Sequence, residues 1–332
     1  MANQIDLTKV EARLKENITD YGKIFSLKLA NGFGIKADPM FTVLPIKDKL
    51  LLTKSTTKPI LQEGRTGAPN FTTGVIELTT RWGQLQPFKA DLKIEEQELY
   101  AWGKNYLGSK KPTDPTDIYS FNAMAWYMEQ IYNQAGKDMH GVIFDGVKGG
   151  AGANNTKIAD GLKLLFTQGI ATTGPGAVGD IPADNVIAAA AVIDQTNVLI
   201  EINKLAMRII ELCEESDEDA ILNLDPMVYA HMINALNSQL SNSSQYVVRT
   251  GSEICLALLP NTRIVKRKWL KSTPGKMFWT PLGNFFWLAP EENTTDLPSI
   301  QVEKADRAIK IFIDGEMGVN YGDGRVLFMN SK

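Results

Sequence analysis

The sequence predicts an α+β fold, and three observations support this class. Residues 6–20 have apolar positions at spacings of three and four, which is typical of an amphipathic helix: Leu7, Val10, Leu14 and Ile18. Residues 88–95 alternate strictly between apolar and charged side chains, which is typical of a half-buried strand. The last part of the chain, IQVEKADRAIKIFIDGEMGVNYGDGRVLFMN, reads as a series of short strands.

The composition is that of an ordinary globular protein. The 332-residue chain has a hydrophobic fraction of 44%, a charged fraction of 22% and a formal net charge of −3 at pH 7. These values are typical of soluble proteins and predict no non-specific attraction to nucleic acid or anionic membranes. Cys213 and Cys255 are the only cysteines, so we expect a reducing compartment and no disulfide framework. Charges interrupt every early apolar run, so we expect no signal peptide, no membrane helix and no export.

The first third of the chain divides into an arm and an extended excursion. Residues 22–50 read as irregular, because NGFG and DP interrupt the short apolar pieces. Residues 50–95 read as a long two-stranded excursion, in which extended, β-rich segments flank the polar turn KPILQEGRTGAPN. An isolated two-stranded ribbon is only marginally stable in water. We therefore expect the excursion to lie on the body of the protein or on a neighbouring molecule.

Helices and strands are both predicted in the remainder. A short helix is expected over residues 95–107 and a long amphipathic helix over about 116–136, with Thr116 or Asp117 as N-cap and Gly136 as the C-terminal stop. Further helices are predicted for DNVIAAAAVID and TNVLIEINKLAMRIIELCEES, and strands for AILNL, EICLALLP, RIVKRKWL, KMFWTP and NFFWLA.

The stretch GPGAVG, residues 174–179, satisfies the GxGxxG pattern of dinucleotide-binding loops, and Asp194 follows near the position of a ribose-binding acid. The surrounding sequence does not fit this function. The pattern should follow a hydrophobic strand and open a helix, whereas FTQGIATT precedes it and Pro175 and Pro182 stiffen the loop. We therefore expect no nucleotide cofactor.

Asp225 and His231 form a second candidate site. Asp225 precedes Pro226 at the start of a predicted helix, so it is expected to accept hydrogen bonds from free N–H groups as the N-cap. His231 lies beside the expected buried stripe, which consists of Val228, Met232, Ala235 and Leu236. No nucleophile accompanies the pair, so we interpret it as structural rather than catalytic.

Other polar clusters also lack a catalytic or metal-binding pattern. The acidic run EESDED, residues 214–219, has no EF-hand spacing, and the two histidines and two cysteines have no local ligand spacing, so no metal is expected. The basic stretch RIVKRKWL, residues 263–270, is read as a strand with polar contacts on both sides. Nearby aromatic residues are expected in a sheet core or subunit contact: Trp279, Phe285, Phe286 and Trp287.

The order of these features resembles the major capsid proteins of tailed phages, which have the Hong Kong 97-type capsid fold. IYSFNAMAWYMEQIYNQAGKDMHGVIFDG resembles the spine helix of that fold and its exit. AILNLDPMVYAHMINAL resembles its strand–Asn/Asp–Pro–helix unit, and ICLALLPNTRIVKRKW resembles the segment that follows. The resemblance covers about residues 20–330 and is one of order and pattern.

The resemblance implies five regions. They are an N-terminal arm (1–49), an E-loop (50–95), a P-domain with the spine helix (96–156), a mixed α/β A-domain (157–297) and strands that return to the P-domain (298–332). Subunit contacts are expected at the E-loop tip, at Glu63, Arg65, Asn70 and Phe71.

The implied function is that of a structural protein with no active site and no cofactor. Copies of the chain would assemble through pentamers and hexamers into an icosahedral virion shell, built in the host cytoplasm without membranes. The shell would enclose double-stranded DNA without sequence-specific binding, and portal, scaffolding and decoration proteins are the partners that the resemblance implies. A mildly acidic subunit suits this role, because a strongly basic wall would hold the genome.

Three alternatives remain open from the sequence. The chain could form an encapsulin-type nanocompartment of the same fold, which would enclose a cargo enzyme. It could be a soluble α/β enzyme that uses nucleotides through GPGAVG or the Asp225 region. It could also be a β-rich adhesion or binding module.

Overall fold

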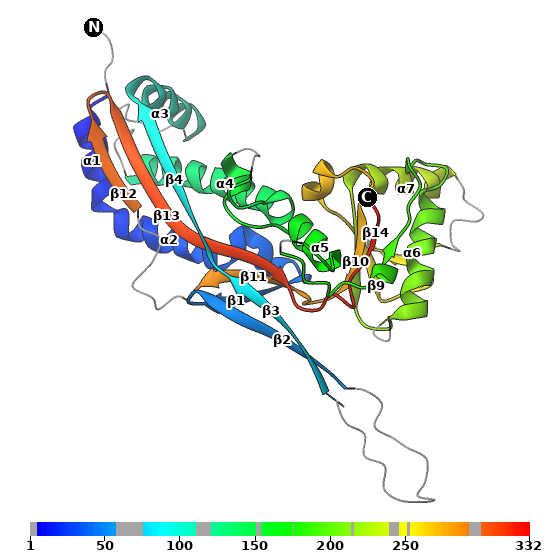
Figure 1. The fold of residues 1–332 in the computed structure, drawn as a ribbon. Helices are drawn as coiled ribbons and strands as arrows, with labels where there is room; N and C mark the ends of the chain where they lie inside the picture. The colour runs from blue at the N-terminus through cyan, green and yellow to red at the C-terminus, as the bar shows by residue number, and fades with distance from the viewer. Residues whose placement is uncertain are drawn as a thin grey trace, which may run out of the picture.

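The protein consists of two β-sheets, a separate two-stranded ribbon and helices that pack between and around them (Figure 1). The computed structural model describes residues 5–57, 76–110, 121–150, 154–174, 176–213, 216–238, 246–250, 253–291 and 300–332. The five-stranded sheet lies toward one end of the molecule and the seven-stranded sheet toward the other. This arrangement confirms the predicted α+β class. No helix within these ranges is long and apolar enough to cross a membrane.

The N-terminal segment is more regular than predicted. The helix expected over residues 6–20 is two helices, α1 (Leu7–Glu16) and α2 (Ile18–Ala30), and the Asp6 carboxylate caps the first one. The prediction of irregular structure from residue 22 is wrong, because α2 carries a buried stripe with a spacing of four: Tyr21, Phe25 and Leu29. A 3₁₀ helix, η1 (Gly32–Ala37), and strand β1 (Phe41–Ile46) follow.

Strand β13 (Ala308–Tyr321) organises the five-stranded sheet. Its first half pairs with β12 (Ile300–Ala305) on one side, β4 (Gln86–Glu95) pairs along its other side, and its last residues pair with β11 (Phe285–Pro290). Strand β1 completes the sheet through parallel pairing with β11. The sheet is therefore built from segments that lie far apart in the sequence.

Strand β4 confirms one prediction and corrects another. Its side chains alternate as expected, since Phe88, Ala90, Leu92 and Ile94 are more buried than the charged residues between them. However, β4 pairs with β13 over its whole length, so it belongs to the body of the protein. The prediction that residues 50–95 form one two-stranded excursion is therefore wrong for this half. Helix α3 (Glu96–Lys110) follows at once.

Helix α4 (Phe121–Asp145) is the long central helix and contacts α1, α2, α3 and α5 (Figure 1). The sequence predicted its end at Gly136, but the helix continues to Asp145. Packing overrides the low helix propensity of glycine, because the buried stripe continues past Gly136 with Met139, Val142, Ile143 and Phe144. The expected caps Thr116 and Asp117 lie outside the described residues.

The seven-stranded sheet has the order β5-β14-β10-β6-β9-β8-β7. Its strands are β5 (Val186–Ile187), β6 (Ala220–Leu224), β7 (Val247–Thr250), β8 (Glu253–Leu256), β9 (Thr262–Lys266), β10 (Met277–Pro281) and β14 (Phe328–Asn330). Helices α6 (Val198–Leu212) and α7 (Pro226–Ser238) share a core with one face, which includes Trp279. The other face, which includes Phe278, joins the main core with α4 and α5 (Leu162–Ile170). Both faces of the central strands are thus buried.

One expectation for this half is wrong. DNVIAAAAVID is not a helix, because Val186 and Ile187 pair as a short parallel strand with β14. The last strands of the chain are shared between the sheets, since β11, β12 and β13 belong to the five-stranded sheet and β14 to the seven-stranded sheet. Among the described strands the chain therefore passes between the two sheets three times, between β4 and β5, between β10 and β11 and between β13 and β14. The helix TNVLIEINKLAMRIIEL is confirmed, although Leu212 of its predicted stripe is exposed.

Candidate functional site

The candidate site is the two-stranded ribbon, which contacts the body of the protein through its second strand and β13. Strands β2 (Lys49–Thr57) and β3 (Ile76–Gln84) pair antiparallel, from Lys49 opposite Gln84 to Thr57 opposite Ile76, and form a sheet of their own. In Figure 1 the ribbon extends away from the two larger sheets. Because a two-stranded sheet has little stability alone, the contacts at its base determine its position.

One face of the ribbon base packs on the body. Leu50 packs in a small apolar cluster with Leu288 of β11, and a Cβ at Gly83 would lie only 3.0 Å from the Leu288 side chain. The absence of a side chain at Gly83 therefore allows β3 to approach β11 closely. We call this side, with Leu50, Leu52, Arg81 and Gly83, the body face of the ribbon.

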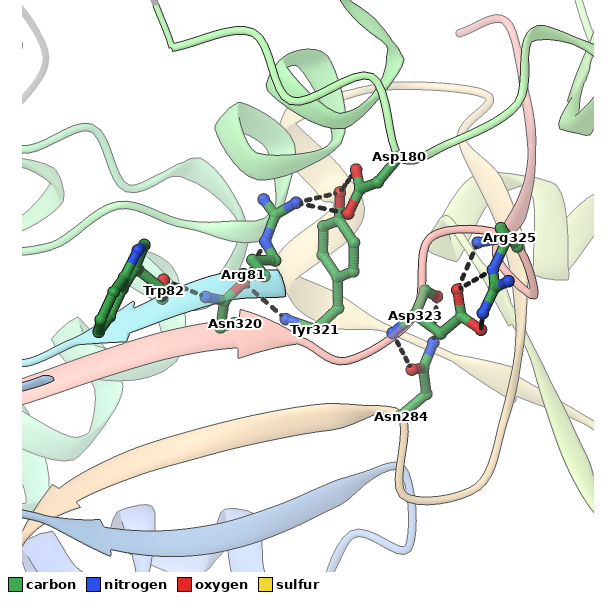
Figure 2. Close-up of polar contacts among 8 residues, drawn as sticks. All are labelled: Arg81, Trp82, Asp180, Asn284, Asn320, Tyr321, Asp323 and Arg325. Atoms are coloured by element: carbon green, nitrogen blue, oxygen red, sulfur yellow. Dashed lines mark hydrogen bonds and ion pairs between the residues drawn. The ribbon is translucent and has the colours of Figure 1, made fainter. Parts of the chain in front are cut away.

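Arg81 fixes the ribbon by a buried charge cluster (Figure 2). Its guanidinium donates hydrogen bonds to the Asp180 carboxylate (2.9 Å), the Tyr321 hydroxyl (2.6 Å) and the Asn320 side-chain oxygen (2.7 Å). The guanidinium carbon also lies 3.8 Å from the centre of the Tyr321 ring. Asn320 in turn donates to the backbone oxygen of Trp82 (2.8 Å). These contacts hold β3 against β13 and against the loop that contains Asp180.

The Arg81 and Tyr321 side chains of this cluster are buried. Burial raises the pKa of the Tyr321 hydroxyl well above its usual range, and the hydroxyl donates to Asp180 (2.8 Å). Gly169 of α5 makes room for that hydroxyl, since a Cβ at Gly169 would lie 2.1 Å from it. Each charged or polar group is occupied by the others, so the cluster is suited to fix geometry rather than to transfer protons.

A second polar cluster secures the nearby crossover between the sheets (Figure 2). The Asn284 side chain accepts from the backbone N–H of Asp323 (2.8 Å) and donates to its carbonyl oxygen (3.0 Å). Arg325 forms a two-point ion pair with the Asp323 carboxylate, with both hydrogen bonds at 3.1 Å. The turn after β10 is thereby fixed to the turn after β13. Residues of both clusters, including Arg81, Asp180, Asp323 and Arg325, line a cavity of about 280 Å³.

The other face of the ribbon is open. Leu51 and Trp82 are directly opposed across the two strands and are 40% and 64% exposed, and Ile76 on the same side is 64% exposed. Polar residues complete this side, which we call the open face: Lys49, Thr53, Thr80 and Gln84. Large exposed apolar side chains on a projecting ribbon indicate a surface that another molecule covers.

The residues expected at the E-loop tip, Glu63, Arg65, Asn70 and Phe71, lie outside the described residues. Sequence reasoning missed Arg81 and Asp180, which hold the ribbon. An arginine between exposed residues of an alternating strand gives a weak signal, because the same pattern fits a solvated side chain. Its partner Asp180 is about a hundred positions away, and no local spacing connects them.

Asp225 connects two segments of the chain, but not in the predicted way. The buried Asp225 carboxylate accepts from the backbone N–H of Gly275 (3.2 Å), so it joins the start of α7 to the loop before β10. The predicted cap to the helix N–H groups is therefore wrong, whereas the predicted stripe of α7 is confirmed. The aromatic residues Trp279, Phe285 and Trp287 are fully buried and Phe286 is partly buried, as expected for sheet cores.

The basic stretch RIVKRKWL is a strand only to Lys266. Arg267 is buried, binds both carboxylate oxygens of Asp38 and donates to the Asn223 side chain (2.6 Å). It thus joins the N-terminal segment to β6. Arg263 pairs with Glu253 at the surface (3.1 Å).

The last two candidates from the sequence are the GPGAVG loop and a metal site. GPGAVG follows α5, with Gly174, Gly176 and Gly179 at positive φ, and the chain continues into the short 3₁₀ helix η4 (Ala183–Asn185) rather than into an α-helix. Among the residues that the structure describes, no group of three or more His, Cys, Asp or Glu side chains is placed to hold a metal ion.

Comparison with known proteins identifies the fold. No protein-family model and no curated protein matches the chain. A chain of the satellite phage P4 procapsid that includes the size-determination protein is similar, with a TM-score of 0.51, 13% identity and coverage of 88% of this chain and 92% of that one.

Two further solved structures agree. The capsid of Myoviridae phage XM1 gives a TM-score of 0.50 and 12% identity, with 89% of this chain and 90% of that one covered. The capsid of cyanophage P-SCSP1u gives a TM-score of 0.50 and 10% identity, with 89% of this chain and 87% of that one covered. The chain therefore has the Hong Kong 97-type capsid fold that its sequence predicts.

Proposed function

We propose that this chain is a major capsid protein, a subunit that assembles with copies of itself into the icosahedral shell of a tailed phage. The observation that carries the proposal is the ribbon: its body face is fixed by Arg81, and its open face carries Leu51, Ile76 and Trp82. An exposed apolar face on a rigid projection serves contact with another molecule. The fold shared with the phage capsid structures supports a second copy as that molecule.

Assembly follows from repetition of one contact. When the same ribbon contacts the next copy at a different surface, the contact is heterologous, and it closes into rings if the rotation allows. Pentamers and hexamers are the rings that an icosahedral shell needs. The proposal includes subunit contacts by Glu63, Arg65, Asn70 and Phe71. It also includes a shell that is assembled in the host cytoplasm, becomes part of the virion and encloses double-stranded DNA. Portal, scaffolding and decoration proteins are the proposed partners. The proposed role is structural and involves no reaction.

Electron microscopy and sedimentation of the purified protein test this function. We expect shells, tubes or capsomer rings for the natural sequence, and their loss in a Leu51→Ser/Trp82→Ser variant that keeps its circular dichroism spectrum. The matched control is Thr53→Ser/Thr80→Ser, which changes the same open face without removing large apolar area. A natural protein that stays monomeric or dimeric and binds nucleotide would contradict the proposal. The contents of purified shells, nucleic acid or a cargo enzyme, separate the phage capsid from the encapsulin alternative.

A further inference from the structure

A cavity of about 520 Å³ lies between the second half of α4 and the 3₁₀ helix η6 (Lys268–Ser272), far from the ribbon in sequence. Its size falls in the range of small-ligand sites, about 300–1,000 Å³. The groups that define its chemistry are Lys137, His140 and Lys268, the aromatic Trp269, and two glycines of α4, Gly136 and Gly141.

Gly141 keeps the α4 wall of the cavity open. A Cβ built at Gly141 would meet nothing within 4 Å, so packing does not require a glycine there. Gly146 on the same helix is different, because a Cβ there would lie 2.2 Å from the backbone oxygen of Ala159. A larger residue at position 141 could therefore fill the cavity without a clash with the core.

The cavity has an excess of positive charge. No carboxylate is among its lining residues, and within the described part of the chain no carboxylate lies within 4 Å of the ammonium groups of Lys137 or Lys268. An adjoining cavity of about 260 Å³ shares His140, Lys268 and Trp269 and adds Lys266.

The one carboxylate in the adjoining cavity is already neutralised. Both oxygens of Asp38 bind the buried guanidinium of Arg267. The joined cleft therefore presents cations without a free counter-charge, although the whole chain has a net charge of −3. Such local charge excess attracts a multiply charged anion.

The neighbouring aromatic ring narrows the class of anion. Trp269 is half-buried, packed on Phe144 with ring centres 5.5 Å apart, and part of its surface lines both cavities. Ammonium groups beside an aromatic ring suit a nucleic-acid strand, whose phosphates pair with the cations while a base or sugar contacts the ring. An acidic peptide would use the cations alone.

We propose that the cleft between α4 and η6, formed by Lys137, His140, Lys268 and Trp269, binds phosphate groups of a nucleic-acid strand. This site is independent of the ribbon and goes beyond the shell function. If the chain forms a shell that contains nucleic acid, the face with this cleft is the one turned toward that content.

Fluorescence anisotropy with the full-length, unassembled protein tests the site. The probe is a fluorescein-labelled mixed-sequence DNA of about 20 nucleotides, single-stranded and as a duplex, between about 50 and 200 mM NaCl. Lys137→Gln/Lys268→Gln is expected to weaken binding about tenfold or more and to reduce the salt slope by about 2. The matched control, Lys148→Gln/Lys163→Gln, removes two exposed lysines elsewhere and is expected to stay within about twofold of the natural protein.

A second variant separates the cleft from general surface charge. Gly141→Leu keeps every charge but places a bulky side chain in the cavity, and we expect it to weaken binding as well. The proposal is overturned if either the lysine variant or the Gly141→Leu variant binds like the natural protein, or if the control loses as much affinity as the lysine variant. It is also overturned if polyglutamate displaces the probe as well as unlabelled DNA does, because the site would then be one for acidic peptides. None of these outcomes depends on whether shells form.

Discussion

The seven-stranded sheet and the ribbon both carry large apolar side chains, but they cover them differently. Every residue of β6 and β10 is buried, since helices cover one face of the sheet and the main core covers the other. In the ribbon, the body face is covered and the open face exposes Leu51, Ile76 and Trp82. The seven-stranded sheet is therefore stabilised by contacts within the chain, whereas the ribbon leaves one of its two faces available for contact with a different molecule.

The two regions also bury cations differently. Arg81 at the ribbon base is paired with Asp180 and hydrogen-bonded to Tyr321 and Asn320. Lys276, beside the start of β10, is buried and donates to the backbone oxygen of Asn330 (2.8 Å), and no described carboxylate forms an ion pair with it. Removal of the charge should therefore have opposite consequences at the two positions. At Arg81 it removes the contacts that hold the ribbon, whereas at Lys276 it removes a buried charge whose desolvation costs stability.

The largest expected effect is the difference in stability between alanine variants of two tryptophans, one in the seven-stranded sheet and one in the ribbon. Trp279 is fully buried and its indole N–H donates to the Thr262 hydroxyl (2.9 Å), so Trp279→Ala should lower the free energy of unfolding by about 3–5 kcal/mol. Trp82 is 64% exposed, so Trp82→Ala should lower it by less than about 1 kcal/mol while it impairs assembly. Urea denaturation of the unassembled variants measures both values. Equal losses of stability would show that the ribbon is part of the folding core and contradict the comparison.

Much of the fold is predictable from local pattern. Strand β4 and helices α6 and α7 follow from periodicity, because each buries one face along its whole length. The extension of α4 past Gly136 and the strand at Val186 were not predictable, because packing and pairing with distant segments override local propensity there.

The candidate site was less accessible from sequence than the fold. The alternation of the 50–95 region predicts extended structure but not that β3 ends at Gln84 and β4 leaves the ribbon for β13. Arg81 and Asp180 meet only because β13 brings Tyr321 and Asn320 between them. Such a contact depends on the tertiary fold, and no spacing in the sequence contains it.

The next effect tests whether Arg81 holds the ribbon on the body. Arg81→Met leaves Asp180 and Tyr321 without their charged partner, so we expect a loss of about 2–4 kcal/mol of unfolding free energy and loss of assembly. The control is Arg263→Met, whose ion pair with Glu253 is largely exposed and contributes less than about 1 kcal/mol. Thermal or urea unfolding gives the difference. An Arg81→Met protein as stable as the control variant would show that the cluster does not anchor β3.

The smallest expected effect, and the most specific, is a pH dependence at Lys276. Burial, followed by the positive charge of Lys163, lowers the pKa of Lys276 from 10.5 to about 8. Between these values the unfolded chain binds more protons than the folded one, so the stability of the natural protein should rise from pH 8 to pH 10.5. The rise from this group is about 3 kcal/mol at most.

Lys276→Met removes the buried charge and its pH-dependent contribution to stability, which should stabilise the protein at pH 7. It also leaves the Asn330 carbonyl without its hydrogen-bond donor, which should destabilise it, so the two effects at pH 7 oppose each other. The readout is therefore the difference in unfolding free energy between the natural protein and the variant as a function of pH. Titration of Tyr132 and Tyr321, whose pKa values burial raises, is common to both proteins and cancels in this difference. We expect the difference to shift in favour of the natural protein as pH rises from 8 to 10.5, and to stay flat for the exposed control Lys148→Met. If the difference in unfolding free energy for Lys276→Met is also independent of pH, the Lys276 ammonium is as well solvated as a surface lysine. The seven-stranded sheet would then accommodate this charge without an ion-pair partner, unlike Arg81 at the ribbon base.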